Sequence, residues 1–102
     1  MDGALRALAD PTRRAILRLV HDDELAAGEI ARHFPVMSRP AVSQHLRVLK
    51  DAGLVHEAKA GTRRIYSADA KALGELRVAI DEMWRTALGE FAATLNEKEE
   101  QS

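Results

Sequence analysis

Polar and basic side chains of the segment 38–55 gather on one side of a predicted helix, where they could form hydrogen bonds with a ligand. Ser38 can cap the start of this helix, and Gly53 suits the left-handed position after its end. The apolar side of the helix repeats at helical spacing through Val42, Leu46 and Leu49. The opposite side is polar or basic and comprises Arg39, Pro40, Ser43, Gln44 and Arg47, with His45 beside them.

Side chains of these types read the edges of bases in the major groove of DNA. A glutamine such as Gln44 can pair with adenine through two hydrogen bonds, an arginine can do the same with guanine, and Pro40 can touch a thymine methyl group. The start of the helix favours a phosphate nearby, and His45 is placed to reach a base or a phosphate. The alternative is that a polar side with two arginines is merely solvated. Features elsewhere in the chain are needed to distinguish these two interpretations.

The net charge of the chain is nearly zero, but the middle of the chain is basic. The 102 residues carry a net charge of -1. Residues 37–67 hold six basic and two acidic side chains, whereas residues 89–102 hold four acidic side chains and one basic. This segregation favours a nucleic-acid surface in the middle of the chain and none at its end.

A short hairpin is predicted directly after the helix. The strands 54–60 and 63–67 are separated by Gly61-Thr62, which fits a two-residue turn with glycine first. Arg63 and Arg64 follow the turn, where a hairpin can hold a phosphate or enter the minor groove. The residues expected to contact DNA are therefore Ser38, Arg39, Pro40, Ser43, Gln44, His45, Arg47, Lys59, Thr62, Arg63 and Arg64.

Further helices are predicted on both sides of this unit. They cover about 2–8, 11–21, 28–34 and 70–96. Four helices, a hairpin and a last helix make a mainly α fold with a small β-hairpin, in the order of a winged helix-turn-helix. We expect one DNA-binding domain over 1–102, with the helix-turn-helix over about 26–53, the wing over about 54–67 and dimerisation helices over about 2–8 and 70–96.

Four segments in this order resemble the ArsR/SmtB family of winged helix-turn-helix repressors. They are ADPTRRAIL (9–17), SQHLRVL (43–49), AGLV (52–55) and GTRRIY (61–66), and the resemblance covers about Leu5 to Phe91. The DPTRR start and the tryptophan of the last helix are most similar to the metal-independent SdpR-like branch. The resemblance implies a homodimer that binds a palindromic operator and represses transcription, with Ser43, Gln44 and His45 as base-reading positions.

The last predicted helix carries more apolar surface than one small domain can cover. Its apolar residues step by three and four along a helix about 40 Å long, at about 1.5 Å per residue. Part of this stripe packs on the body of the chain, and the excess, with the first helix, predicts a second chain. The residues expected at the dimer interface are Leu5, Leu8, Leu76, Ile80, Met83, Trp84, Ala87, Leu88 and Phe91.

Other classes of site find little support in the sequence. The chain has no cysteine, and Glu29 with His33 supplies only two metal ligands, so neither a disulfide nor a metal site is expected. The sequence offers no glycine-rich phosphate loop and no nucleophile with a plausible base, so we expect neither an enzyme nor a cofactor. The chain has four aromatic residues, which is too few to predict a surface that stacks the bases of a single-stranded nucleic acid. Without a long apolar run or a signal-peptide pattern, we expect a cytoplasmic protein.

Two alternatives stay open at this point. The first is a winged-helix module that binds a protein partner and no DNA, which predicts a helix side without base-reading groups or a wing without arginines. The second is a repressor whose small-molecule or metal inducer binds at the dimer interface, around Met83, Trp84 and Leu88. The sequence itself names no inducer.

Overall fold

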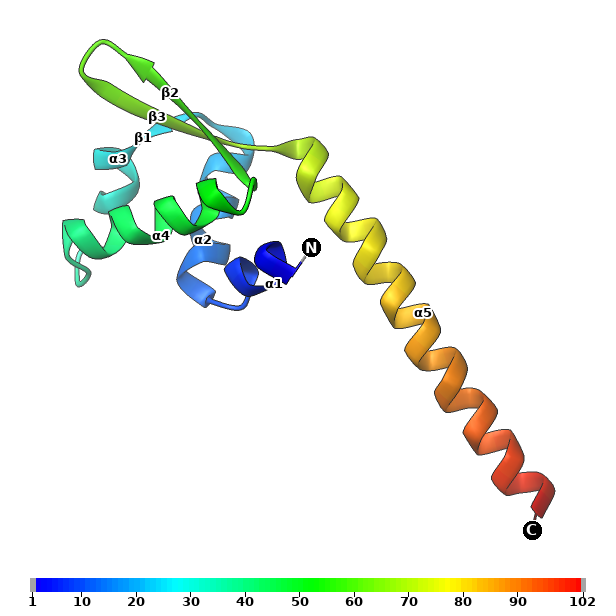
Figure 1. Ribbon diagram of the computed structural model, residues 1–102. Coiled ribbons are helices and arrows are strands. Elements are labelled where there is room, and N and C mark those ends of the chain that lie inside the picture. The colour runs from blue at the N-terminus through cyan, green and yellow to red at the C-terminus, as the bar shows by residue number, and fades with distance from the viewer. Residues whose placement is uncertain (1, 102) are drawn as a thin grey trace.

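Most of the chain is helical, and a small antiparallel sheet connects the helical body to the last helix (Figure 1). The computed structural model describes the backbone of residues 2–101 and the side chains of residues 2–98. In chain order the elements are α1 (Asp2–Leu8), α2 (Pro11–Asp22), β1 (Leu25–Ala26), α3 (Ala27–Arg32), α4 (Arg39–Asp51), β2 (Val55–Ala60), β3 (Arg63–Ala68) and α5 (Ala70–Gln101). The predicted class, mainly α with a β-hairpin in winged helix-turn-helix order, is confirmed.

The sheet contains one strand more than the sequence predicted. The hairpin of β2 and β3 forms as expected, and Gly61 in its turn has a φ of 65°. A third strand, β1, pairs with the other edge of β3, with Leu25 opposite Tyr66 and Ala26 opposite Ile65. Two residues are too few to show an alternating pattern, so only the pairing with β3 identifies them as a strand.

Two helices differ in length from their predicted ranges. Helix α3 starts at Ala27, because the Glu29 carboxylate accepts a hydrogen bond from the Ala26 amide at 3.0 Å. It ends at Arg32, two residues before the predicted end, and the following amides bond to carbonyls three residues back in tighter turns. Helix α5 continues past the predicted end at 96 to Gln101.

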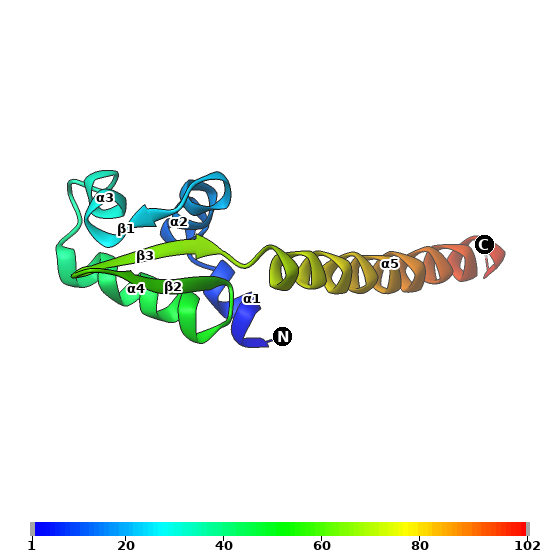
Figure 2. The same ribbon diagram turned by 90° about the horizontal axis from the view of Figure 1, so that it is seen from above.

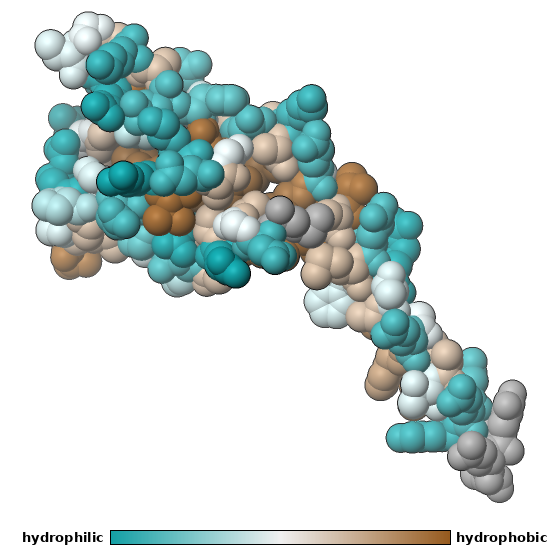
Figure 3. Space-filling view, in the orientation of Figure 1, coloured by the Kyte–Doolittle hydropathy of each residue, from teal (hydrophilic) through white to brown (hydrophobic). Residues whose placement is uncertain are grey.

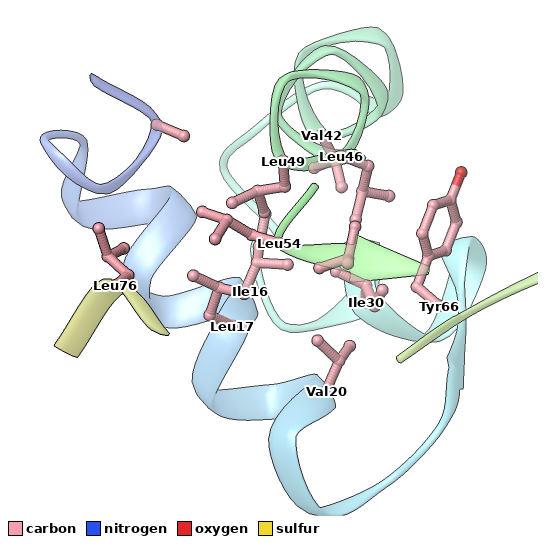
Figure 4. Packing of buried hydrophobic residues seen from close by; sticks show 12 residues of the cluster. Ile16, Leu17, Val20, Ile30, Val42, Leu46, Leu49, Leu54, Tyr66 and Leu76 are labelled. Carbon is pink, nitrogen blue, oxygen red and sulfur yellow. The ribbon is translucent and has the colours of Figure 1, made fainter. Parts of the chain in front are cut away.

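The core lies between α2, α3, α4 and the start of the hairpin (Figure 4). Each helix buries one side, and the predicted apolar side of α4 is confirmed, with Val42, Leu46 and Leu49 at most 2% exposed. The other buried residues of the cluster are Ala7, Ile16, Leu17, Val20, Ile30, Leu54, Val55, Tyr66 and Leu76. Because one side of α4 is fixed in this core, its opposite side must face outward.

Helix α5 projects far beyond the body (Figures 1 and 2). Its 32 residues span about 48 Å at about 1.5 Å per residue. The molecule measures 68 × 29 × 20 Å, and its radius of gyration of 18.6 Å exceeds the roughly 13 Å of a compact chain of this length. Only the first turns of α5 pack on the body, through Leu73, Leu76 and Ile80. Among the described residues, no helix is long and apolar enough to cross a membrane.

Candidate nucleic-acid interface

Helix α4 is built and oriented by a few residues at its ends. The Ala41 amide donates to the Ser38 hydroxyl at 3.2 Å, so the predicted cap forms. Proline in the first turn has the backbone angle that the helix needs and no amide to leave unsatisfied. After the helix, Gly53 takes a φ of 77°, the left-handed conformation expected of it. The helix is therefore held at both ends as well as along its buried side.

The outward side of α4 presents polar and basic side chains to solvent. Arg39, Pro40, Ser43, Gln44 and Arg47 are all exposed, as is the capping residue Ser38. Their spacing places them on the side opposite the buried Val42 and Leu46. This side can offer hydrogen-bond donors and acceptors to an edge of the bases in a groove.

His45 is placed differently from the other residues that were expected to contact DNA. Its side chain is only 20% exposed, and Nδ1 lies 3.5 Å from an Arg13 guanidinium nitrogen and 4.0 Å from Asp10 Oδ2. Both partners belong to the start of α2, where Asp10 caps the helix by accepting from the Arg13 amide at 3.0 Å. This backbone hydrogen bond and the nearby charges hold the pKa of Asp10 below its ordinary value.

The wing carries four of the expected residues, all exposed: Lys59, Thr62, Arg63 and Arg64. Successive residues of a strand point to opposite faces, so Arg63 and Arg64 leave β3 on different sides. Arg63 donates to the Glu29 carboxylate of α3 at 2.8 Å. Arg64 lies opposite Lys59 in the register and bonds to Glu57 at 3.3 Å. The two arginines therefore have different carboxylate partners, Glu29 and Glu57.

Glu57 joins the wing to α4, and sequence reasoning missed it. Its carboxylate accepts from the Tyr66 hydroxyl at 2.9 Å, and it lies 3.6 Å from the Lys50 ammonium and 3.3 Å from Arg64. The hydrogen bond from Tyr66, with the two nearby cations, holds the pKa of Glu57 below its ordinary value, while burial and this carboxylate raise the pKa of Tyr66. The position of Glu57 directly opposite Tyr66 could have identified the pair once the hairpin register was known.

Two polar hollows connect α4 with the wing. One, of about 380 Å³, lies between α3, the start of α4 and the turn, and its arginines are Arg32, Arg39, Arg63 and Arg64. The other, of about 550 Å³, lies between Ser43, Arg47 and Lys50 of α4 and Glu57, Arg64 and Tyr66 of the wing. The structure thus brings Arg39 together with Thr62, Arg63 and Arg64. It brings Ser43 and Arg47 together with Arg64. Gln44 and Lys59 are exposed but line neither hollow.

A second surface, on α5, is apolar and exposed. Met83 is 53% exposed, Trp84 62%, Leu88 57% and Phe91 61%. A groove of about 400 Å³ lies between α1 and α5 and is lined by Leu5, Ile80, Met83, Trp84 and Ala87. Figure 3 shows apolar and near-neutral surface on the side of α5 that is turned toward the body.

The expectation for Leu76 was wrong. It was expected at a dimer interface, but it is only 7% exposed and packs in the core of its own chain, because the first turns of α5 lie on the body. Leu8 is half-buried against the same core, as is Leu5. The apolar stripe of α5 therefore divides into a part that its own chain covers and a longer part that it leaves open.

The described residues contain no group of three or more metal-ligating side chains. Glu29, one of the two candidate ligands in the third predicted helix, is engaged by the Ala26 amide and by Arg63. His33 lies just past the end of α3 and is exposed.

Comparisons with known proteins agree with this geometry. A family model described as a helix-turn-helix domain matches residues 8–58. The chain is 52% identical, over 93% of its length and 88% of the relative's, to the HTH-type transcriptional regulator Rv2034 of Mycobacterium tuberculosis. It is 38% identical to the transcriptional repressor SdpR of Bacillus subtilis, over 72% of this chain and 80% of that protein.

Among solved structures, the chain is similar to the homodimeric winged helix-turn-helix DNA-binding domain of Mb0332 from Mycobacterium bovis, a possible ArsR-family transcriptional regulator. The TM-score is 0.67 and the identity 28%, with 82% of this chain and 77% of that chain covered. The shared architecture includes the helix-turn-helix and the wing that form the two polar hollows.

Proposed function

The chain belongs to the ArsR/SmtB family of winged helix-turn-helix transcriptional repressors, and on that premise we propose that it acts as a homodimer on a palindromic operator. It is a DNA-binding transcriptional regulator, and this family is not a class of enzymes. In the proposed complex α4 enters the major groove, and the wing rests on the backbone or in the minor groove. The domain divides into a helix-turn-helix of α3 and α4, a wing of β2 and β3, and dimerisation helices α1 and α5.

The observation that carries this proposal is the exposed side of α4 beside a basic wing. Ser43, Gln44 and Arg47 offer hydrogen bonds to base edges, whereas Arg39 and Arg63 line a hollow that suits a phosphate. The start of α4 and the hairpin turn lie at the end of the molecule away from α5 (Figures 1 and 2). This position leaves α5 clear of the DNA and available to a second chain.

The proposed occupant of the apolar face of α5 is a second copy of this chain. Large exposed apolar patches are rare on proteins that stay monomeric, and here Trp84, Phe91 and the groove beside Leu5 form one such face. The relative of known structure that is homodimeric has the same architecture. A two-fold dimer would place two copies of α4 on one side of the duplex, about 34 Å apart.

We further place the chain in the metal-independent SdpR-like branch. Two features support this assignment: the similarity to SdpR, and a sequence without the cysteines that thiolate metal sites require. The ion pair of Glu29 with Arg63 also engages a carboxylate that a metal in α3 would need.

Selection of bound duplexes from a random pool tests the proposed function. The wild-type protein should enrich an inverted repeat whose half-sites are centred about one helical turn apart. Enrichment of unrelated duplexes, or of a single unrepeated site, would contradict the palindromic operator. A protein that enriched no duplex at all, while capturing a protein partner, would instead support the interaction-module alternative.

A further inference from the structure

His45 is turned toward the protein, unlike the exposed residues around it on α4. It lies between Gln44 and Arg47 in a segment whose other polar members face solvent, yet its side chain is 20% exposed. Its Nδ1 faces the Arg13 guanidinium at 3.5 Å and the Asp10 carboxylate at 4.0 Å. A side chain held in this way has less freedom to reach a base than its neighbours have.

The chemistry of the Arg13 contact defines the state of the ring. A guanidinium has only donors, so in a hydrogen bond with Arg13 at 3.5 Å the Nδ1 of His45 is the acceptor, and the Asp10 carboxylate is farther away at 4.0 Å. An accepting Nδ1 bears no hydrogen, so in this arrangement the ring hydrogen is on Nε2. A hydrogen on Nδ1 would face the N–H groups of Arg13, and two donors cannot form a hydrogen bond with each other.

Arg13 in turn holds the end of α1. Its Nε donates to the Ala7 carbonyl at 2.6 Å, and a terminal nitrogen donates to the Arg6 carbonyl at 3.1 Å. These carbonyls belong to the last turn of a helix, where backbone acceptors lack partners within the helix. One guanidinium therefore bonds to the end of α1 and to His45 on α4.

Helix α1 also borders the apolar groove that a second chain would cover. Leu5 lines this groove together with Ile80 and Trp84 of α5. Arg13 thus links an element at the proposed dimer surface with the element that faces the DNA. Its amide and the Asp10 carboxylate complete the corner between α1 and α2.

We propose that His45 is a positioning residue that fixes the rotation of α4 against the corner of α1 and α2, and that it does not itself read a base. This inference rests on the proposed function of α4 as the DNA-reading helix. Through Arg13, the ring aligns the reading helix with the dimerisation helix. Gln44 and Arg47 then enter the groove at an angle that both half-sites share.

Two substitutions of similar size separate positioning from base reading. Asparagine places an amide oxygen near the position of Nδ1, whereas glutamine places its amide near Nε2. We expect His45→Asn to bind the selected operator within about twofold of the wild type, since the Arg13 contact survives. His45→Gln and His45→Ala should bind about tenfold less tightly, the size of one hydrogen bond to a charged group.

The preferred base at each operator position should be unchanged in all three variants. Retained affinity in His45→Gln with loss in His45→Asn would overturn the proposal, because Nε2 would then be the working atom. A changed preference at one base pair in His45→Ala would also overturn it. Gln44→Ala serves as the comparison, since loss of a base-reading side chain should alter the preference at one position of each half-site.

Arginine substitutions supply a matched pair on the other side of the contact. Arg14 donates to the Leu8 carbonyl at 2.6 Å and so also caps the end of α1, and this hydrogen bond does not involve His45. Arg13→Gln should weaken operator binding more than Arg14→Gln does. Combined with His45→Ala, Arg13→Gln should cost little more than either change alone, whereas additive losses would contradict the link.

Nitrogen NMR of the free protein tests the contact without DNA. At a pH well above the range in which histidine titrates, the His45 ring, assigned by its loss in His45→Asn, should show the proton on Nε2 and an accepting Nδ1. Arg13→Gln should shift the Nδ1 resonance, and Arg14→Gln should leave it in place. A ring with its proton on Nδ1 would refute the proposal. If the wild-type protein selected no duplex, the proposed function would fail separately, and this measurement would still decide the contact.

Discussion

At the scale of single residues, the polar side chains near α4 have two kinds of surroundings. Gln44 and Arg47 extend into solvent, whereas Arg63 and Arg64 of the wing are paired with Glu29 and Glu57. Exposed ion pairs, such as that of Arg63 with Glu29, contribute only about 0–1 kcal/mol. A DNA phosphate can therefore replace Glu29 beside Arg63 at little cost in stability.

Removing the amide of Gln44 should change which sequences the protein prefers. Gln44→Ala is expected to cost about 1–3 kcal/mol at one base pair of each half-site and to relax the preference there. Competition binding with the selected operator and its single-position variants measures the effect. Asn96→Ala, which removes an exposed amide from α5, is the control. Equal losses on operator and random duplex would show that Gln44 does not read a base.

Arg63 should act on every duplex alike. Arg63→Ala is expected to weaken operator and random DNA by similar factors and to reduce the slope of log affinity against log salt by about one. The reason is the loss of one phosphate contact and of its released counterion. Arg85→Ala on α5 should leave the slope unchanged. An unchanged slope in Arg63→Ala would place this arginine away from the backbone.

Glu57 should make the fold sensitive to acid. Its pKa is lowered in the folded chain, so its ionised form contributes stability that is present above its ordinary pKa of 4.5 and is lost as the pH falls through the folded value. Glu57→Gln should lower the free energy of unfolding by about 1 kcal/mol at neutral pH and by less near pH 3. Urea denaturation at both pH values gives the comparison.

Glu75→Gln, at an exposed position of α5, is the control for Glu57→Gln. It should leave the free energy of unfolding nearly unchanged at both pH values. A loss in Glu57→Gln that was the same at neutral and acid pH would mean that the charge of Glu57 contributes nothing to the fold.

At the scale of elements, local residues explain what the sequence predicted and distant contacts explain what it missed. The Ser38 cap, the buried side of α4 and the Gly61 turn depend on neighbours within a few residues, and all three form as predicted. Strand β1 is visible only through its pairing with β3. The contacts of His45 with Arg13 and of Arg63 with Glu29 join residues more than thirty positions apart, which no local pattern reveals.

The last helix shows the same division within one element. Its apolar repeat predicted that one part packs on the body and that a second chain covers the excess, but the repeat cannot tell where one part ends and the other begins. The structure buries Leu76 in the chain's own core and leaves Trp84 and Phe91 exposed. The periodicity therefore predicts that an apolar residue of α5 is buried by some partner. The length of the body determines which of these residues the same chain buries and which are left for the proposed second chain.

At the scale of the whole molecule, the exposed polar side of α4 with the wing and the exposed apolar face of α5 lie toward opposite ends of a 68 Å particle. A dimer through α5 and α1 would cover that helix and double the DNA-facing surface. The two functions then depend on each other, because a monomer has one reading helix and a dimer aligns two. The homodimeric structure of a related winged helix-turn-helix domain supports a dimer as the DNA-binding form of this chain.

A charge placed in the apolar face should separate the two chains. Trp84→Glu and Ile80→Glu are expected to yield monomers in sedimentation, since a carboxylate cannot be buried there without a partner. Affinity for the operator should fall at least about a hundredfold, because the second half-site no longer adds to the first. Arg85→Glu, on the far side of α5 by helical spacing, should stay dimeric. A monomer that bound the operator with the affinity of the wild type would contradict the proposed dimer.

The affinity of the wild-type protein for its selected operator, measured before and after the half-sites are moved apart, tests whether one dimer binds both half-sites. Insertion of about five base pairs turns one half-site to the opposite side of the duplex. A two-fold symmetric dimer that places one α4 in each half-site should then bind the lengthened operator no more tightly than it binds a single half-site. Undiminished affinity for the lengthened operator would contradict the account, because the two reading helices would not be acting on one face of the DNA.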